Sequence, residues 1–240
     1  MNSLEDILSI PSYIINLDKS KERLINTFNL LEKAKFKNII RFKAIDGNTN
    51  DLEKLFAKLI PNYEFEEWDG LFKTVKGKQG CFLSHFLLWD HIISNKIPYA
   101  NIFEDDIKFH DSWSLAEFYI NNTPSDFDMI FMGSKVMYKP TNFISNSPCY
   151  CTHAYILSYN GALKLKNYFS KTPIFTIDCK LYELMENIIR SRCQQYFKWY
   201  VWNTNDFNDL LLLSCTSNNG LILQDETFQS VIISNKKEIN

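Results

Sequence analysis

The sequence feature that most constrains the fold is a short apolar run, residues 99–103, that ends in Glu104-Asp105-Asp106, the acidic triplet. Residues of high strand propensity lie on both sides of this triplet, because Ile107 and Phe109 follow it. The pattern predicts a buried strand that delivers three carboxylates to the edge of a sheet.

Three neighbouring carboxylates repel one another, and a divalent cation offsets this repulsion. Mg²⁺ and Mn²⁺ prefer hard oxygen ligands and keep coordination positions free for water and phosphate oxygens. On an extended backbone Glu104 and Asp106 would point the same way, so we expect these two to bind one Mn²⁺ or Mg²⁺ ion. For an isolated triplet of this kind a solvated acidic turn is the alternative.

Composition limits the class of protein. With 240 residues, 45% of them hydrophobic, the chain can bury one substantial core. A net charge of -2 gives no support for nucleic-acid binding. The N-terminus is acidic where a secretory signal needs basic residues, and no apolar run approaches the roughly 20 residues of a membrane helix. We therefore expect a soluble protein without a transmembrane segment.

The first part of the chain predicts an α/β layer fold. Residues 13–17 form a compact apolar run, and the following helix places Leu24, Phe28 and Leu31 on one face. A second strand is expected at residues 39–45. Because a strand, a helix and a strand follow one another, a parallel pair is favoured.

A glycine-rich helix start precedes the acidic triplet. Gly77 and Gly80 come before a helix that carries Ser84 and His85, and free backbone N–H groups at such a start suit a phosphate or a sugar hydroxyl. Ser84 and His85 are better explained as a buried, hydrogen-bonded pair than as catalysts. Further strands are expected near residues 128–133 and 152–158, and further helices follow the last of these.

These blocks together resemble glycosyltransferase family 25, which includes bacterial lipooligosaccharide galactosyltransferases and collagen hydroxylysine galactosyltransferases. No single block is specific, but their order and spacing extend over most of the chain. The residues that carry the resemblance are Ile15-Asn16-Leu17-Asp18, Arg23, Ala44-Ile45-Asp46-Gly47, Gly77, Gly80 to His85, Trp89, Phe103 to Asp106, Gly133, Thr152 to Ala162, Ile177-Asp178 and residues 224–230.

The resemblance implies a GT-A-type nucleotide-sugar-binding domain with a Rossmann-like, mostly parallel central sheet flanked by helices. One domain would span residues 1–240, with a core at about 11–190 and residues 191–240 completing the acceptor side. A UDP-sugar, with galactose favoured, would bind with Mn²⁺ or Mg²⁺ at Glu104 and Asp106. The implied donor-binding residues are Asn16, Leu17, Arg23, Asp46, Gly80, Ser84 and Asp105.

The implied reaction is inverting, so one carboxylate must deprotonate the acceptor hydroxyl. Asp178 is the candidate base, although an N-cap role for the helix after it explains Asp178 equally well. For Arg23 two interpretations remain open: it contacts the nucleotide, or it is a surface residue of the helix. Trp199 and Trp202 either form a sugar-stacking surface or pack in the core, and packing is the simpler expectation.

Two alternatives to an active transferase remain open from the sequence. The first is an inactive relative that binds a nucleotide sugar or a glycan. The second is a metal-dependent phosphohydrolase, for which four scattered histidines supply no cluster. The acceptor is either a glycan, as in lipopolysaccharide biosynthesis, or a hydroxylated peptide, as in collagen-type glycosylation. We expect a cytoplasmic location, with peripheral contact at the inner membrane face or a viral origin as variants.

Overall fold

The computed structural model describes residues 1, 3–66, 70–136, 142–193, 196–204 and 217–228. Its centre is an eight-stranded sheet in the order β2-β1-β3-β7-β5-β8-β6, and β9 also pairs with β5. The strands are β1 Pro11–Asn16, β2 Asn38–Lys43, β3 Tyr99–Glu104, β5 Met129–Val136, β6 Ile144–Ser145, β7 Tyr150–Ser158, β8 Trp199–Trp202 and β9 Ser217–Gly220. A separate two-stranded sheet pairs β4 Ile107–Phe109 with β10 Ile222–Gln224.

Most strands of the central sheet run in one direction. β1 is parallel to both β2 and β3, and β5 is parallel to β8. β7 lies between β3 and β5 and is antiparallel to both, so β5 runs in the same direction as β1. The predicted α/β class with a mostly parallel central sheet flanked by helices is confirmed.

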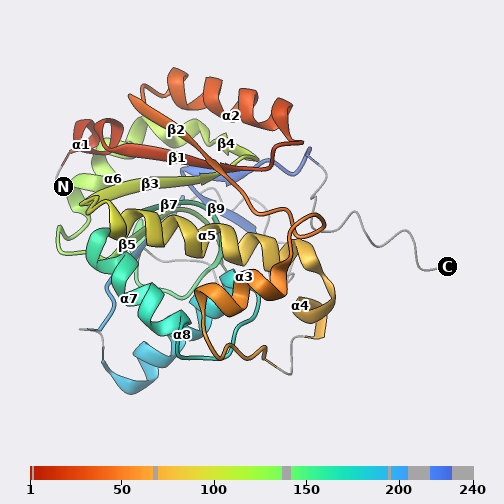
Figure 1. Ribbon diagram of the computed structural model, residues 1–240. Helices are drawn as coiled ribbons and strands as arrows, with labels where there is room; N and C mark the ends of the chain where they lie inside the picture. Colours follow the sequence, from red (N-terminus) through yellow and green to blue (C-terminus); the bar gives the residue numbers. More distant parts are fainter. Residues whose placement is uncertain (2, 67–69, 137–141, 194–195, 205–216, 229–240) are drawn as a thin grey trace.

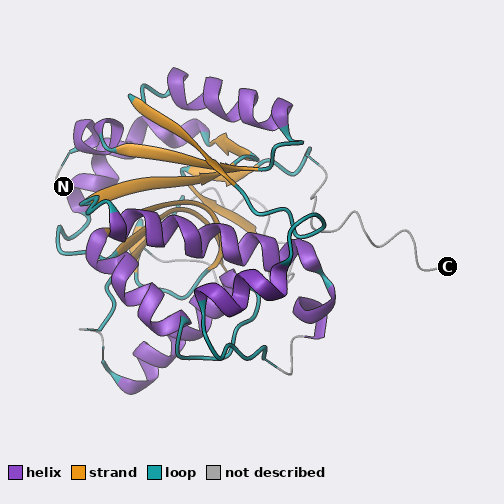
Figure 2. Cartoon of the chain, in the orientation of Figure 1, coloured by secondary structure: helices purple, strands orange, loops and turns teal. Residues whose placement is uncertain are grey.

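Helices cover both faces of the sheet (Figure 1, Figure 2). They are α1 Leu4–Ser9, α2 Lys21–Lys33, α3 Leu52–Leu59, α4 Gly70–Thr74, α5 Lys76–Ser94, the 3₁₀ helix η1 Asp111–Leu115, α6 Ala116–Asn122, α7 Tyr159–Phe169 and α8 Ile177–Ser191. One buried cluster joins α3, α5, α7 and α8 to the sheet, and the other joins α1, α2 and α6 to the opposite face.

Strand β7 shows why both faces need cover. Tyr155 and Leu157 belong to one cluster, whereas Ala154 and Ile156 belong to the other, and all four are fully buried. Successive side chains of a strand point to opposite faces, so an uninterrupted apolar run is stable only between two helical layers.

Packing of helix α2 differs from the expectation at one residue, whereas packing of two tryptophans agrees with it. In α2, Leu31 is buried and Leu24 packs against the same cluster, as predicted, whereas Phe28 is 38% exposed and was wrongly assigned to this face. Trp199 and Trp202 are buried, and the Trp202 indole N–H donates to Thr123 Oγ1 at 2.9 Å, which confirms packing for this pair. Residues 205–216 lie outside the described residues.

The register of the parallel strands positions the functional site. Asn16 pairs with Lys43 in β2, and Ile15 pairs with Glu104 in β3. The carboxyl ends of β1, β2 and β3 therefore lie at one edge of the sheet. The strands β2 and β3 follow β1 in the sequence and lie on opposite sides of it. Open α/β sheets bind ligands at this kind of position. Among the described helices, none is long and apolar enough to cross a membrane.

Candidate active site

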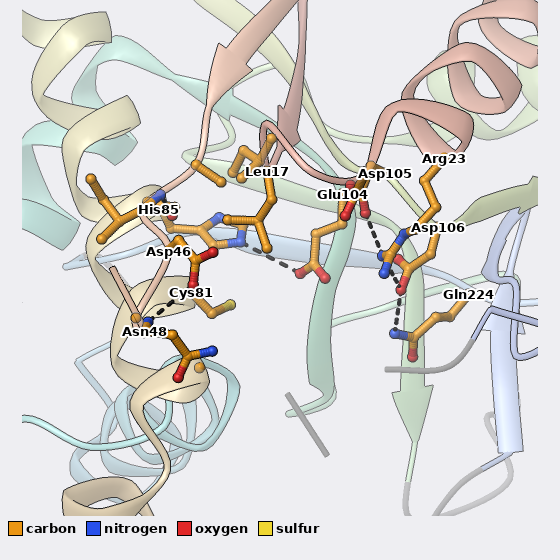
Figure 3. A pocket seen from close by; sticks show the side chains of 17 residues that line it. Leu17, Arg23, Asp46, Asn48, Cys81, His85, Glu104, Asp105, Asp106 and Gln224 are labelled. Carbon is orange, nitrogen blue, oxygen red and sulfur yellow. Dashed lines mark hydrogen bonds and ion pairs between the residues drawn. The ribbon is translucent and has the colours of Figure 1, made fainter. Parts of the chain in front are cut away.

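A pocket opens at the carboxyl ends of β1, β2 and β3 (Figure 3). Strand β3 and the turn after it supply the acidic triplet, the loop after β2 supplies residues 44–48, and α5 supplies one wall. The lining residues are Ile15, Leu17, Ser20, Arg23, Ala44, Ile45, Asp46, Gly47, Asn48, Gly77, Cys81, Ser84, His85, Glu104, Asp105, Asp106 and Gln224.

The acidic triplet lies where the sequence predicts, but its side chains are arranged differently. Strand β3 ends at Glu104, and Asp105 and Asp106 form a turn, so alternation along an extended backbone does not apply. In Figure 3, Glu104 points towards His85, whereas Asp105 and Asp106 both point towards Arg23. The triplet thus divides between two sides of the pocket.

Asp105 is held from several directions. Its carboxylate accepts a hydrogen bond from the Asn16 side-chain amide at 2.6 Å and forms an ion pair with Arg23. Its backbone carbonyl accepts a hydrogen bond from Thr27 Oγ1 at 3.0 Å. Burial raises the pKa of Asp105, and the Arg23 charge opposes this effect. These contacts fix the turn, so Asp105 is built into the pocket wall.

Asp106 is less completely satisfied. Its Oδ2 atom lies 2.8 Å from an Arg23 guanidinium nitrogen and 3.4 Å from the Gln224 side-chain nitrogen, whereas its buried Oδ1 atom has no hydrogen-bond partner among the described residues. Burial, together with the charge of Glu104, raises the pKa of Asp106 to about 7. The backbone N–H of Asp225 also donates to the Asp106 carbonyl at 2.6 Å, which brings β10 against the turn.

Glu104 faces the opposite side of the pocket. Its Oε1 atom accepts a hydrogen bond from Thr152 Oγ1 at 2.8 Å and lies 3.4 Å from His85 Nε2. Burial alone would raise the pKa of Glu104, but His85 and Thr152 outweigh burial and hold that pKa at about 2. Glu104 is therefore ionised at neutral pH.

His85 is supported by buried aromatic residues. The Trp89 indole N–H donates to the Tyr155 hydroxyl oxygen at 3.0 Å, and this hydroxyl lies 2.8 Å from His85 Nδ1. The His85 and Tyr155 rings are stacked, with centroids 5.8 Å apart. The imidazole thus has a fixed orientation in which Nε2 faces Glu104.

Ser84 and Gly80 join α5 to the loop after β2. Ser84 Oγ donates to the Gly80 carbonyl at 2.6 Å and accepts from the Ile45 backbone N–H at 2.9 Å. A Cβ atom on Gly80 would lie 2.5 Å from the Ile45 carbonyl oxygen, so only glycine allows this approach. Because α5 begins at Lys76, Gly77 and Gly80 lie inside the helix, and the predicted glycine-flanked helix start is wrong.

The predicted donor-binding residues thus divide into two groups. Leu17, Arg23, Asp46, Ser84 and Asp105 line the pocket, and Asp46 forms an ion pair with Lys19 at 2.8 Å. Asn16 and Gly80 are buried behind its wall and position neighbouring groups. Direct contact of any of these residues with a donor stays a prediction.

Asp178 lies in the first turn of α8 and is not the N-cap residue, which is Thr176, but its Oδ1 atom accepts a hydrogen bond from the Cys179 backbone N–H at 2.9 Å and so satisfies one free donor of that turn. It does not line the pocket described above. Burial raises the pKa of Asp178, and the negative charge of Glu104 adds to this effect, which places the two carboxylates within electrostatic range. The role of Asp178 as a base stays a prediction.

The pocket fits a hard divalent cation. Glu104 and Asp106 offer carboxylate oxygens, and the unpartnered Asp106 Oδ1 atom is the kind of buried acceptor that a cation satisfies. The Arg23 guanidinium already balances charge beside Asp105 and Asp106. The residues present thus match the predicted ligand type.

Comparison with known proteins identifies the family of this chain. Residues 9–181 match the model of "Glycosyltransferase family 25 (LPS biosynthesis protein)". The chain belongs to glycosyltransferase family 25. The matched region of this family 25 chain contains Asn16, Arg23, the acidic triplet and Asp178, whereas Gln224 lies beyond it.

Curated relatives of this family 25 chain are similar at modest identity. "Glycosyltransferase 25 family member" of Drosophila pseudoobscura pseudoobscura is 29% identical over 167 residues, which are 64% of this chain and 26% of the relative. "Procollagen galactosyltransferase 2" of Homo sapiens is 27% identical over 169 residues, which are 64% of this chain and 26% of the relative. "Probable inactive glycosyltransferase 25 family member 3" of Bos taurus is 30% identical over 139 residues, or 51% and 23%. The chain thus spans about a quarter of these relatives.

Among solved structures, a glycosyltransferase involved in glycosylation of the PBCV-1 major capsid aligns over 80% of both chains, with 9% identity and a TM-score of 0.38. Mouse xyloside xylosyltransferase 1 aligns over 89% of this chain and 96% of its own, with 11% identity and a TM-score of 0.39.

Three residues in or beside the pocket have positions that the sequence alone did not assign. Thr152 binds Glu104 from β7, Gln224 reaches Asp106 from β10, and Cys81 lines the pocket from α5. Cys81 and His85 are four residues apart, a spacing that places both on one side of a helix and that could have indicated a shared role. Thr152 and Gln224 come from strands distant in sequence, so pairing geometry was needed to place them.

Proposed function

We propose that this chain is a divalent-cation-dependent, inverting glycosyltransferase that moves a hexose, galactose foremost, from a UDP-sugar to a hydroxyl group. The observation that carries the proposal is the position of Glu104 and Asp106 in a pocket at the carboxyl ends of β1, β2 and β3. Family membership and the name of the human relative, a procollagen galactosyltransferase, support the reaction class and the sugar.

Departure of a diphosphate is the difficult part of the reaction. Mn²⁺ or Mg²⁺ bound to Glu104 and Asp106 would stabilise the negative charge that develops on the diphosphate. Contacts within the chain hold both carboxylates in place. Thr152 orients Glu104, and the contacts of Asp105 fix the turn that carries Asp106. Arg23 supplies a further positive charge at the pocket wall.

The loop after β2 forms the side of the pocket opposite α2 and suits the nucleoside. Asp46 and Asn48 provide polar groups, whereas Leu17 and Ile45 provide apolar surface for a flat base. Ser84 holds this loop through the Ile45 N–H, so the loop has a defined position before a ligand arrives. Preorganisation of this kind lowers the cost of binding.

Inversion at the anomeric carbon requires a base on the acceptor side. Asp178 is the proposed base, because it is a partly exposed carboxylate whose pKa is raised by burial. A raised pKa makes a carboxylate a stronger proton acceptor. The proposed acceptor is a hydroxyl of a glycan or of a hydroxylated peptide.

The test is release of UDP from a panel of UDP-sugars, with and without Mn²⁺, for the unaltered chain, Asp106→Ala and Asp178→Ala. We expect release that requires Mn²⁺, prefers one sugar and falls at least about 100-fold in Asp106→Ala, since the cation stabilises the transition state directly. Release that is equal with and without Mn²⁺, or unchanged in Asp106→Ala, would refute the proposal.

A second candidate is a binding module without turnover, and the similarity to a relative named as probably inactive favours considering it. This candidate predicts saturable binding of a UDP-sugar, measured by calorimetry, with no release of UDP across a panel of glycan and hydroxylysine-peptide acceptors. Asp106→Ala would then weaken binding without any effect on a rate.

A further inference from the structure

A group of three side chains on the α5 side of the pocket has the composition of a transition-metal site. Cys81 Sγ, His85 Nε2 and a Glu104 carboxylate oxygen all lie within 4.8 Å of one another. Figure 3 shows Cys81 and His85 on the α5 side of the pocket and Glu104 between them and Asp106. The cation proposed at Glu104 and Asp106 uses neither the Cys81 thiol nor the His85 imidazole.

The separation of the His85 and Glu104 atoms is compatible with shared coordination of one ion. His85 Nε2 lies 3.4 Å from Glu104 Oε1, and Nε2 makes no hydrogen bond among the described residues although His85 is completely buried. Zinc–nitrogen and zinc–oxygen bonds of about 2.0–2.2 Å at a tetrahedral angle give a separation of about 3.3–3.5 Å between the two ligand atoms. The measured separation lies in this interval.

The surroundings of His85 match those of a metal-binding histidine. The Tyr155 hydroxyl lies 2.8 Å from Nδ1 and also accepts the Trp89 indole N–H. A metal-bound imidazole usually makes an outer hydrogen bond through its second ring nitrogen, which fixes the ring orientation. Tyr155 can provide this contact and leaves Nε2 directed towards Glu104 and Cys81.

Helix α5 supplies Cys81 as well as His85. Cys81 and His85 are four residues apart on α5, so both face the same side. Glu104 is 22% exposed and borders the pocket, which leaves a coordination position open to water. One thiolate, one imidazole and one carboxylate select a zinc-class ion over Mg²⁺ or Mn²⁺, because sulfur and nitrogen are softer ligands.

We propose that Cys81, His85 and Glu104 bind a zinc-class divalent ion, with water as the fourth ligand. Binding forms a metal–sulfur bond and releases the Cys81 thiol proton to solvent. The site is separate from the proposed function except that both use Glu104. Occupation by zinc therefore competes with the cation expected at Glu104 and Asp106.

The experiment uses Co²⁺, which reports a thiolate ligand by near-ultraviolet charge-transfer absorption, whereas Zn²⁺ is spectroscopically silent. The untagged, reduced 240-residue chain is titrated with Co²⁺, and Zn²⁺ is then added. We expect a band that saturates at one equivalent, disappears when Zn²⁺ is added and is absent in Cys81→Ser. Cys151→Ser, which alters a second thiol near the same carboxylates, and the exposed Cys193→Ser should both retain the band.

A band that persists in Cys81→Ser, or that disappears in Cys151→Ser, would overturn the assignment, as would the absence of a band in the unaltered protein. X-ray absorption at the zinc edge gives a second measurement that needs no variant. One sulfur and two or three nitrogen or oxygen neighbours are expected, and a shell without sulfur overturns the proposal. Because both measurements are independent of UDP release, failure of the proposed function would leave this result unchanged.

Discussion

Replacing Arg23 with alanine is the perturbation that tests the electrostatic account of the site most strongly. The guanidinium pairs with Asp105 and Asp106, and its side chain is 14% exposed while the two carboxylates are 9% and 8% exposed. Removing one partner of a buried ion pair leaves uncompensated charge and costs about 3–5 kcal/mol. Because the pKa of Asp106 is already raised to about 7, protonation relieves part of the cost, and we expect about 3 kcal/mol.

The assay is urea unfolding of the metal-free protein at neutral pH, followed by circular dichroism. In thermal unfolding of the same protein, a loss of about 3 kcal/mol corresponds to a fall of about 6–12 °C in Tm for a chain of this length. The matched control is Arg190→Ala, which removes an exposed i,i+4 pair with Glu186 at 3.0 Å and should change stability by less than about 0.5 kcal/mol.

A double variant makes the interpretation specific. Asp106→Asn in the Arg23→Ala background removes one of the uncompensated carboxylates, so it should recover at least about 1 kcal/mol of the loss. If Arg23→Ala behaves like Arg190→Ala, or if the second substitution recovers nothing, the charge balance described here is incorrect.

Three further predictions concern the framework of the site. Ser84→Ala leaves the Ile45 N–H without its acceptor and should cost about 1–3 kcal/mol in urea unfolding; no measurable loss would contradict this anchoring role. Gly133→Ala puts a Cβ atom 1.7 Å from the Ile222 carbonyl oxygen, so a loss of about 3 kcal/mol or more is expected in the same assay, and a neutral effect would contradict the close approach of β10. The raised pKa of Asp106 means that the folded state binds more protons than the unfolded state between about pH 4 and pH 7, so this group lowers stability as pH rises through that interval. Asp106→Asn should therefore reduce the loss of unfolding free energy between about pH 4 and pH 7. An unchanged loss would assign this pH dependence to another group.

Local sequence patterns predicted the elements of the site well. The apolar run before the acidic triplet is strand β3. The strands β1 and β2, which precede and follow helix α2, are parallel. These predictions succeeded because strand propensity, helical periodicity and the geometry of a strand–helix–strand unit are properties of neighbouring residues. The edge of the sheet where the pocket lies follows from the same reasoning.

The side-chain arrangement within the pocket could not be predicted in the same way. Strand alternation predicted that Glu104 and Asp106 point the same way, but a turn at Asp105 and Asp106 gives them different contact partners, and turns are set by contacts such as those of Asn16 and Thr27. Gly80 likewise indicated a phosphate-binding helix start, whereas its space is taken by the Ile45 carbonyl. Such contacts join residues far apart in sequence and have no local signal.

The most direct test of the central claim is to locate the cation. Crystals of the 240-residue chain soaked with Mn²⁺ and UDP would be measured at the manganese absorption edge, and an anomalous difference map would be calculated. The account predicts one peak in the pocket within coordination distance of Glu104 and Asp106 and in contact with the UDP diphosphate. A UDP-bound pocket without a peak at these two carboxylates would contradict it.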